Sequence, residues 1–513
     1  MTATRRAAVA ALLTAPGSAR TAAPDAPTPV SPIGVPLATS HAAHLARRAT
    51  YAATPEIVAD IERMGARAWV DQQLRPASIN DAACDAMMAR DFPWLAQTSA
   101  QIFTATAKQP WRASTLLIRG TTARRIVSKR QLFEVVVDVM TNHVYAVGTN
   151  KVQDVVVEFD RTVVRKHALG RYIDFLNAAI KHPTMLKFLD NTVSTKTSPN
   201  ENLGRELLEL YTVGTGHYTE DDVRQASLLL TGHSYSPRTF KATYTPANHY
   251  VGPLQVMGFQ SANATATGGP AVLTAFLTYL AKHPATARKL CHRLAVRFLS
   301  DTPSESLLND LVRTYQTNNT KIAPVVRRLL LHPQFRQSVG EKWRTPAELM
   351  VAMVAAGAPT YRPAAPHTNS FYVSKILFDA LEAAGNNPRT WPAVNGYPDV
   401  AGYWLTTSTL QQGWQFADVV AQRTDPEWRP QAWATRLGVV AGQDVWAVAG
   451  SITTKLTGYT WPVSAMAAIA AMLATGGSGP APEAPYALSA EEISANLPGA
   501  VRLIFCSPYF QLR

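Results

Sequence analysis

The spacing of the apolar residues is the feature that most constrains how this chain can fold. From about His41 onward these residues recur every three or four positions, as in TPEIVADIERMGARAWVDQQL, RQLFEVVVDVMTNHV and PAVLTAFLTYLAKHP. Such spacing gathers apolar side chains on one side of an α-helix. Strand-like alternation is scarce, and the best candidate for a short hairpin is 234–251. We therefore expect a mainly α protein, a multi-helix body with orthogonal and antiparallel helix packing and at most a minor β-hairpin.

Composition and charge exclude several classes of protein. Of the 513 residues, 47% are hydrophobic and 17% charged, which is unlike a disordered chain. The longest apolar run, 465–474, is too short to cross a bilayer, so we expect no transmembrane span. The formal net charge of +13 suits an anionic polymer or membrane surface. However, the basic residues are scattered and form no known nucleic-acid-binding motif, so we expect no specific nucleic-acid partner.

The N-terminus has the features of a targeting segment. Arg5 and Arg6 precede a short apolar run, Ala7–Leu13, and small residues follow at 21–23. Paired arginines before an apolar run are typical of the twin-arginine export route, and the small residues resemble a cleavage site. We therefore expect an exported protein, extracytoplasmic or secreted. The alternative is an alanine-rich disordered tail.

Segments rich in proline and glycine divide the chain. Three His-Pro pairs, at His182, His283 and His332, predict corners between helices, and a further helix is expected from about Phe371 to Ala384. We expect a signal segment at 1–23, a Pro-rich linker at 24–40, an N-terminal helical half with the Asn-Glu-Asn/Arg-Glu region at 41–260, a C-terminal helical half at 261–474, a second linker at 475–488, and a C-terminal helix and tail at 489–513. Ser489 and Glu492 predict a capping box at the start of that last helix.

The segment from Ser198 to Asp222 carries an unusual density of carboxylates. Local interactions account for most of them. Ser198 and Glu201, with Pro199 between them, predict a capping box, and Thr219 and Asp222 predict another. Residues Glu201, Arg205 and Glu209 lie four apart, which predicts a ladder of ion pairs along one helix.

The same segment also has a functional interpretation. Leu208 points away from the main apolar face, so another element could cover part of the charged side. Glu206 and Glu209 would then be acid/base or metal-binding carboxylates, with His143 and His249 brought from elsewhere in the chain. The polar approach to this helix could also receive an anion. Its candidate binding residues are Asn200, Glu201, Asn202 and Arg205. The sequence identifies no metal and no cofactor.

A second unusual segment is WPAVNGYPDVAGYW, from Trp391 to Trp404. Its rings either fill the core or form a surface on which a sugar or polymer stacks. The candidate binding residues are Trp391, Tyr397 and Trp404.

Several stretches carry a resemblance to a known family. They extend from His41 to the C-terminus and include FDRTVVRKHALGRYIDFLNAAIKHPTMLKFLDN, NENLGRELLELYTVGTGHYTEDDVRQASLLLTG and SPYFQLR. The chain resembles a large bacterial family catalogued as domain-of-unknown-function family 1800. The resemblance implies a mostly helical, exported protein. It also implies a partner, because the family is often encoded beside a second exported family that looks like a sulfatase or phosphatase.

The chain departs from the family pattern at two places. Members usually carry His-Asn-His-aromatic where this chain has Thr141 to Val144, and His-Asp-x-Gly-x-Lys where it has His249 to Leu254. One histidine, an acid and a lysine are therefore missing, and any chemistry at those positions would be lost or altered here.

Three classes of function follow from these observations. The first is an exported accessory or binding protein that acts with a partner enzyme or an anionic envelope polymer. The second is a hydrolase or metal-dependent enzyme that uses Glu206, Glu209, His143 and His249. The third is a structural component of the envelope.

Overall fold

The protein is an elongated assembly of helices. The computed structural model describes residues 37–513 except 52, 149, 362–375 and 484. In that part of the chain there are 26 α-helices and three two-stranded antiparallel sheets, so the prediction of a mainly α protein is confirmed. The predicted signal segment, residues 24–36 of the predicted linker, and the first residues of the helix expected from Phe371 lie outside the described residues.

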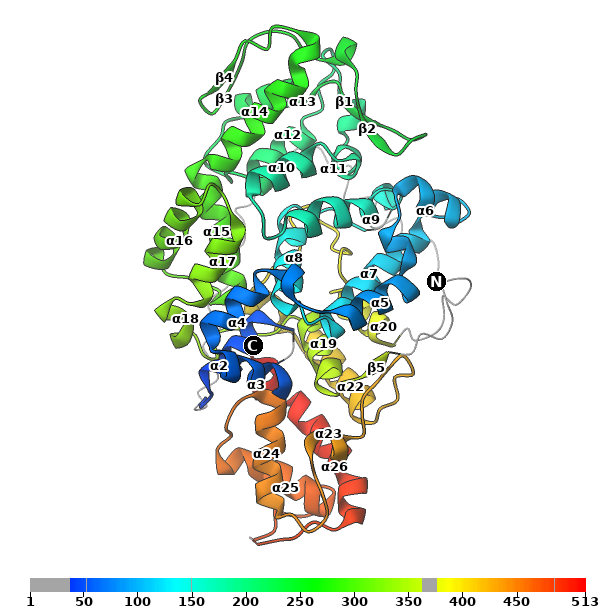
Figure 1. Cartoon of the computed structure of the whole chain (residues 1–513), viewed down its shortest axis with the longest axis vertical. Helices are drawn as coiled ribbons and strands as arrows, with labels where there is room; N and C mark the ends of the chain where they lie inside the picture. The colour runs from blue at the N-terminus through cyan, green and yellow to red at the C-terminus, as the bar shows by residue number, and fades with distance from the viewer. Residues whose placement is uncertain (1–36, 52, 149, 362–375, 484) are drawn as a thin grey trace.

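The upper end of the molecule in Figure 1 combines helices with two hairpins. Strand β1 (His233–Ser236) pairs with β2 (Lys241–Tyr244) inside the segment predicted as a hairpin. Strand β3 (Leu254–Val256) pairs with β4 (Phe259–Ser261). The helices here are α10 (Tyr172–Ile180), α11 (Pro183–Phe188), α12 (Asn202–Glu206), α13 (Glu220–Leu230) and α14 (Gly269–Lys282).

The middle of the molecule is built around α8 (Gln131–His143), α15 (Pro284–Phe298) and α19 (Pro346–Ala356). All residues of α19 are buried, because this helix is apolar on every side and is enclosed by its neighbours. The other helices of the middle are α2 (His41–Ala49), α3 (Pro55–Met64), α4 (Ala66–Gln73), α5 (Ala82–Asp91), α6 (Ser99–Ala105), α7 (Trp111–Val127), α9 (Val156–Phe159), α16 (Glu305–Thr317), α17 (Ile322–Leu330), α18 (Pro333–Gln337), α20 (Ile376–Ala383), α21 (Ala401–Trp404) and α22 (Thr407–Ala421).

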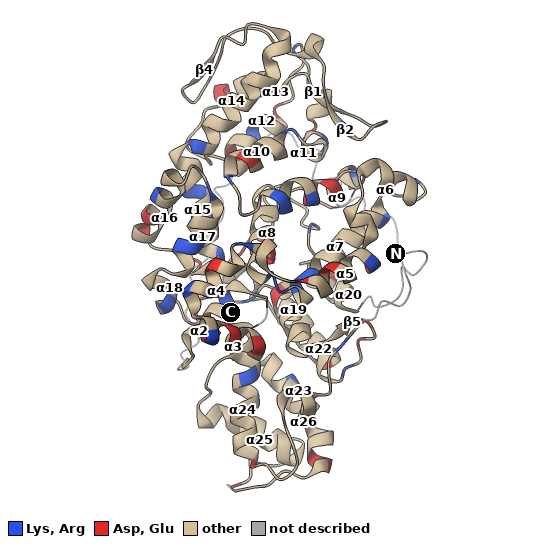
Figure 2. Cartoon of the chain, in the orientation of Figure 1, with Lys and Arg blue, Asp and Glu red and all other residues tan. Residues whose placement is uncertain are grey.

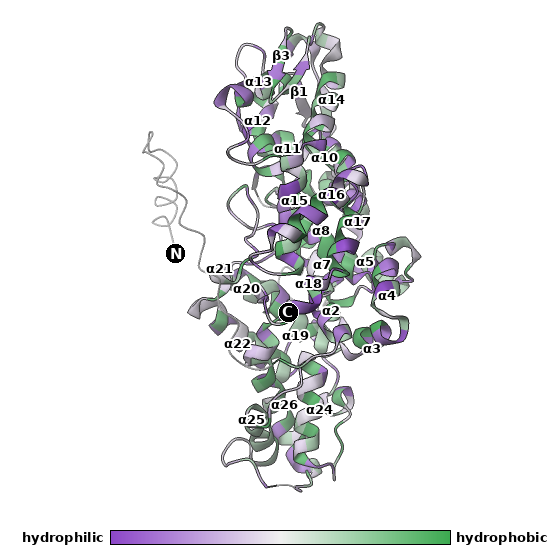
Figure 3. Cartoon of the chain, turned by 90° about the vertical axis from the view of Figure 1, so that its left-hand side faces the viewer, coloured by the Kyte–Doolittle hydropathy of each residue, from purple (hydrophilic) through white to green (hydrophobic). Residues whose placement is uncertain are grey.

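The lower end is a small group of helices that ends with the C-terminus returning to the middle. It contains α23 (Trp433–Leu437), α24 (Val445–Thr457), α25 (Val463–Thr475), α26 (Ala490–Cys506) and α27 (Pro508–Gln511). The third sheet joins β5 (Thr360–Tyr361) to β6 (Trp428–Arg429). Buried apolar residues from Ala42 to Leu512 form one continuous cluster. Many helices in Figure 3 accordingly show one apolar side and one polar side.

Two findings bear on partners. Lys and Arg are spread over many helices in the view of Figure 2 and do not gather on one face. Among the described residues, no helix is long and apolar enough to cross a membrane.

Several predicted helix boundaries are confirmed by their caps. His182, His283 and His332 each occupy the N-cap position, and each ring nitrogen accepts a backbone N–H two residues ahead. The capping boxes at Thr219 with Asp222 and at Ser489 with Glu492 are present.

The capping box predicted at Ser198 is wrong. The backbone of Ser198 instead pairs with Thr195 in a tight turn, and α12 begins only at Asn202, whose N–H is accepted by the Asn200 side chain at 3.0 Å. Because the backbone of Ser198 is held in this turn, Ser198 does not occupy the N-cap position of the helix.

The predicted ion-pair ladder forms only in part. Arg205 pairs with Glu201 at 3.4 Å and with Glu220 at 2.6 Å, but Glu209 accepts the Tyr218 hydroxyl instead. The cause is the π-helical segment η6 (Leu207–Tyr211) that continues α12. A wider turn rotates Glu209 away from Arg205.

Candidate functional site

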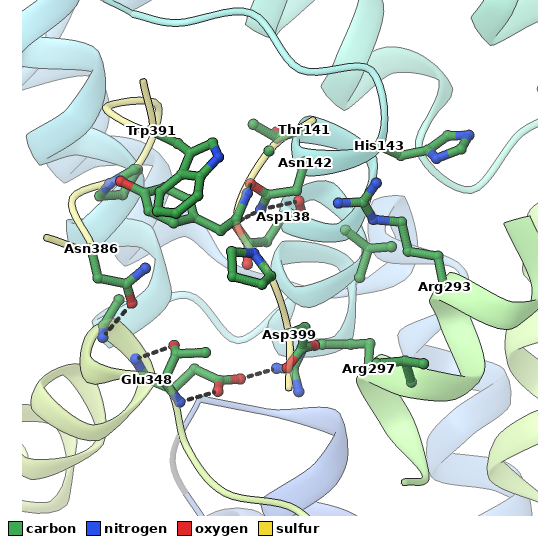
Figure 4. A pocket seen from close by; sticks show the side chains of 18 of the residues that line it. Asp138, Thr141, Asn142, His143, Arg293, Arg297, Glu348, Asn386, Trp391 and Asp399 are labelled. Carbon is green, nitrogen blue, oxygen red and sulfur yellow. Dashed lines mark hydrogen bonds and ion pairs between the residues drawn. The ribbon is translucent and has the colours of Figure 1, made fainter. Parts of the chain in front are cut away.

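A cavity of about 570 Å³, which we call the central cavity, lies in the middle of the molecule. Its walls come from α7, α8, α15, α19, the loop 386–400 and the last residue, Arg513. Figure 4 shows the side chains of these separate elements facing one space. A volume of this size is typical of a small-molecule site.

Every carboxylate that lines the central cavity is paired with a cation. Glu348 accepts from Arg297 at 2.6 Å and from Arg513 at 2.6 Å, and it also completes a capping box at the start of α19. The remaining pairs are Glu134 with Arg165, Asp138 with Arg125, Asp160 with Arg389, Asp301 with Lys342, and Asp399 with Arg513 and Lys342. Buried charges are stable only when they are paired in this way.

The pairing fixes the charge of these carboxylates. Burial acts to raise the pKa of Glu348, but Arg297 and Arg513 outweigh it and hold that pKa below its usual value. The pKa of Asp399 is likewise lowered, because Arg513 and Lys342 outweigh the effect of burial. Both carboxylates are therefore ionised at neutral pH.

Two cations of the central cavity have no such carboxylate partner among the described residues. Arg293 donates only to the backbone carbonyl of Asn395, at 3.3 Å, and the ammonium of Lys289 donates to the carbonyl of Glu209. The two residues lie four apart on α15 and hence on one side of that helix. Burial, followed by the charge of Arg293, lowers the pKa of Lys289 to about 8. An anion placed beside them would relieve this repulsion.

The arginines also retain unused hydrogen-bond donors. Nη1 of Arg297, Nη1 of Arg389 and Nε of Arg513 are buried without a partner among the described residues. These residues are 4%, 2% and 2% exposed. A buried donor left unpaired costs about 1–3 kcal/mol. A bound ligand or water that accepts these bonds would remove the cost.

Local backbone geometry holds the wall of the cavity in place. Arg389 has a left-handed conformation, with φ of 60°, and its carbonyl accepts the N–H of Gly148 at 2.6 Å. Gly396 has φ of 71°, and a Cβ on it would lie 2.4 Å from the carbonyl oxygen of Asn142. Another π-helical segment, η4 (Asp160–Arg165), supplies Asp160. Such strained or widened backbone is enriched at functional sites.

The aromatic loop contributes in two ways. Tyr397 and Trp404 are buried, and their polar atoms donate to the carbonyls of Asn387 and Pro398 within the loop region. Tyr397 also lines the cavity, together with Trp391 and Tyr403. The rings of Trp391 and Tyr403 have centroids 5.5 Å apart, and Tyr403 is 46% exposed. Figure 4 shows Trp391 at the edge of the cavity, across from Arg293.

His143 lies at the cavity as a buried, hydrogen-bonded residue. It is 2% exposed, and its Nε2 is 3.0 Å from the Tyr172 hydroxyl, which itself donates to the carbonyl of Tyr211. Burial, then the charges of Arg293 and Lys289, keep its pKa well below the usual value. The imidazole is therefore neutral at physiological pH.

His249 is not brought to the central cavity. Its ring nitrogens lie 2.9 Å from the carbonyl of Thr231 and 3.0 Å from Oδ1 of Asn263, near the hairpins of the upper end. Glu206 and Glu209 lie half-buried near Lys289. Burial and the charge of Glu209 raise the pKa of Glu206. The structure thus places three of the four predicted catalytic residues, His143, Glu206 and Glu209, near Lys289, and leaves His249 apart. Of these three, His143 lines the central cavity.

The predicted binding residues of the α12 region do not line the central cavity. Asn200 caps α12, Asn202 and Glu201 are exposed, and Arg205 is occupied by Glu220. With only five residues, α12 is too short to offer an anion site of its own. Among the described residues, no three His, Cys, Asp or Glu side chains are grouped so that they could hold a metal ion.

The charged residues of the cavity were not singled out from the sequence. One signal was present: Glu348 interrupts a helix that is otherwise apolar on all sides, PAELMVAMVAA, and such a helix is buried. Arg297 similarly sits in the apolar run LAVRFL. Their partners, Asp399 and Arg513, are distant in sequence and carry no local signal.

Comparison with known proteins supports the resemblance seen in the sequence. No curated protein and no solved structure matches the chain. A family model described as "Protein of unknown function (DUF1800)" matches residues 44–512, nearly the whole chain. The chain therefore belongs to the DUF1800 family.

Proposed function

We propose that this protein is an exported binding protein that holds an acidic saccharide unit in the central cavity. The observation that carries the proposal is Arg293. Its guanidinium faces a cavity in which every carboxylate is already paired, and among the described residues it donates to one backbone carbonyl alone. Guanidinium groups bind carboxylate and phosphate oxygens in pairs, which makes an anion the favoured occupant.

The aromatic edge supports a sugar as the body of the ligand. Trp391 and Tyr403 line the cavity, and Trp391 lies across from Arg293 in Figure 4. Tryptophan and tyrosine present broad apolar surfaces against which a sugar ring packs. An acidic sugar combines this ring with a carboxylate or phosphate. Anionic envelope polymers consist of such units, and the positive net charge of the protein favours approach to them.

A matched set of sugars tests this proposal. Glucuronate and glucose 6-phosphate carry the anionic group, and glucose lacks it. By titration calorimetry, we expect the charged sugars to bind at least about tenfold more tightly than glucose. Arg293→Gln should abolish that preference, and Trp391→Ala should weaken all binding. Arg288→Gln, on the same helix but exposed and paired with Glu305, is the control. Equal binding by wild type and Arg293→Gln would overturn the proposal.

Export is part of the proposal. Arg5 and Arg6 stand before the short apolar run in the manner of a twin-arginine signal. Replacing both with lysine should leave the precursor in the cytoplasm, as cell fractionation would show. The family resemblance implies a sulfatase- or phosphatase-like partner. Enzymes of these kinds act on anionic groups, so the partner and this protein would share an acidic sugar as ligand.

An enzyme is the second candidate. A specific observation favours it: Glu206, whose pKa is raised, lies near Lys289, whose pKa is lowered to about 8. A raised carboxyl pKa and a lowered ammonium pKa both move toward neutral pH, and groups that titrate there suit acid/base chemistry. For Glu206 to be catalytic, Glu206→Gln must abolish turnover of a bound acidic sugar without weakening its binding.

A further inference from the structure

A second cavity, of about 400 Å³, lies beside α8 and shares one lining residue of that helix with the central cavity. We call it the lateral cavity. Its walls come from α5, α7, α8, η4 and the 3₁₀ segment η2 (Pro93–Ala96). Glu134 lines both cavities, so its ion pair with Arg165 lies in the wall that they share.

The lateral cavity is lined by more arginines than carboxylates. Arg124, Arg161 and Arg165 are among them, and Arg165 forms a bidentate pair with Glu134, at 2.9 and 2.5 Å. Arg161 donates to the backbone carbonyl of Gln97 at 3.1 Å, and its Nε is buried without a partner among the described residues. Of these three guanidiniums, that of Arg165 is paired with a carboxylate, and those of Arg124 and Arg161 have no carboxylate partner among the described residues.

Of these three arginines, Arg124 has the fewest polar interactions among the described residues. In the part of the chain that the structure describes, its half-buried side chain makes no ion pair or hydrogen bond. Burial, followed by the charge of Arg165, lowers its pKa. A half-buried guanidinium without a counter-ion is unfavourable unless a ligand supplies one.

The other carboxylates of this cavity are already engaged. Asp85 binds Arg130 through two bonds of 2.9 Å, and Asp81 accepts the hydroxyl of Ser128 at 2.6 Å and the N–H of Lys129 at 3.0 Å. Arg130 thus neutralises Asp85, whereas the two hydrogen bonds to Asp81 come from uncharged groups and leave its charge in place.

The rest of the lateral cavity is apolar. Cys84, Met88, Phe92 and Leu95 line it and are between 3% and 8% exposed. The cavity therefore combines arginine side chains with an apolar wall. Its occupant should combine an anionic head with an apolar body.

We propose that the lateral cavity binds an organic phosphate monoester with a short apolar body, whose phosphate contacts Arg124, Arg161 and Arg165. Four arginines and three carboxylates line the cavity, and this excess of positive charge favours a phosphate monoester, whose charge is about −1.5 to −2 at neutral pH. Its oxygens accept paired bonds from arginine forks. This site is separate from the central cavity and does not rest on the function proposed for it.

Calorimetric titration of the full chain with octyl phosphate tests the site. We expect Arg124→Gln and Arg161→Gln each to weaken binding by about tenfold or more, since each removes charge-assisted hydrogen bonds. Arg124→Lys should lose less, because it keeps the charge. Arg63→Gln, in an exposed pair with Asp60 on α3, should bind as wild type. Thermal unfolding of each variant would confirm that it remains folded.

Two comparisons make the proposal falsifiable. Octanol lacks the charge and inorganic phosphate lacks the apolar body, so both should bind more weakly than octyl phosphate. If octanol binds equally well, or if Arg124→Gln binds as wild type, the proposal is overturned. If Arg293→Gln instead abolishes binding of octyl phosphate, the ligand occupies the central cavity and the lateral site is rejected.

Discussion

Two groups of charged residues in this protein contain the same residue types but lie in opposite surroundings. The first, the central cluster, is Arg297, Glu348, Asp399 and Arg513. The second, the α12 cluster, is Glu201, Arg205 and Glu220. The side chains of Arg297, Glu348 and Arg513 are 5%, 8% and 2% exposed, whereas those of Glu201, Arg205 and Glu220 are 47%, 28% and 74% exposed. The sequence singled out the α12 cluster because its charged residues are close together in the chain. The central cluster has the larger effect on stability, because its charges are buried.

The difference predicts unequal effects of removing one carboxylate, and this is the largest effect we expect. Glu348→Gln keeps the amide oxygen for the helix cap but leaves Arg297 and Arg513 without their shared counter-ion. Leaving a buried charge unpaired costs about 3–5 kcal/mol. Glu220→Gln in the α12 cluster should cost less than ~1 kcal/mol. Thermal and urea unfolding followed by circular dichroism would measure both, and equal losses would refute the contrast.

The backbone near the two clusters permits a second comparison. Gly396, beside the central cavity, and Gly216, in the loop after α12, both have positive φ, 71° and 84°. Only Gly396 also lacks room for a Cβ, which would lie 2.4 Å from the Asn142 carbonyl oxygen, whereas Gly216 has no atom within 4 Å. Alanine at Gly216 should cost ~1–2 kcal/mol, from strain alone.

Alanine at Gly396 should cost more, ~2–4 kcal/mol, because overlap adds to the strain. It should also weaken binding in the central cavity, because the loop carries Trp391 and Tyr403. Unfolding and titration on both variants would check this. If the two alanines have the same effect on stability, the loop is free to move away from Asn142 and does not hold the cavity wall.

The helices of this chain could largely be predicted, because their determinants are local. Apolar spacing marked the helices, and His-Pro pairs and two capping boxes marked their ends. The failure at Ser198 was also local in kind: two local structures, a turn and a helix cap, compete for the same residue, and the turn is the one formed. Sequence alone does not decide such a competition.

The site was predictable only in fragments. Trp391 and His143 were identified and do lie at the central cavity. The ion pairs that define the cavity join residues far apart, such as Asp160 with Arg389 and Glu348 with Arg513. Nothing near an arginine in the sequence indicates which distant carboxylate it will meet. A charge inside an otherwise apolar helix, as at Glu348, is the local signal that does indicate burial.

The smallest effect we expect separates carboxylates with opposite pKa shifts. Asp399 and Glu348 have lowered pKa values, so the stability they contribute is present above the unfolded values, about 4, and is lost as the pH falls through the folded ones. Glu206 has a raised pKa, so the stability it contributes is present below about pH 4 and is lost as the pH rises through its folded pKa.

Glu206→Gln removes that loss, and the stability of this variant relative to wild type should therefore increase from pH 4 to pH 7. Urea unfolding at a series of pH values measures the difference. A Glu206→Gln variant whose relative stability stays constant with pH would show that the surroundings of Glu206 do not favour its protonated form, and would remove the main reason for treating Glu206 as an acid/base group.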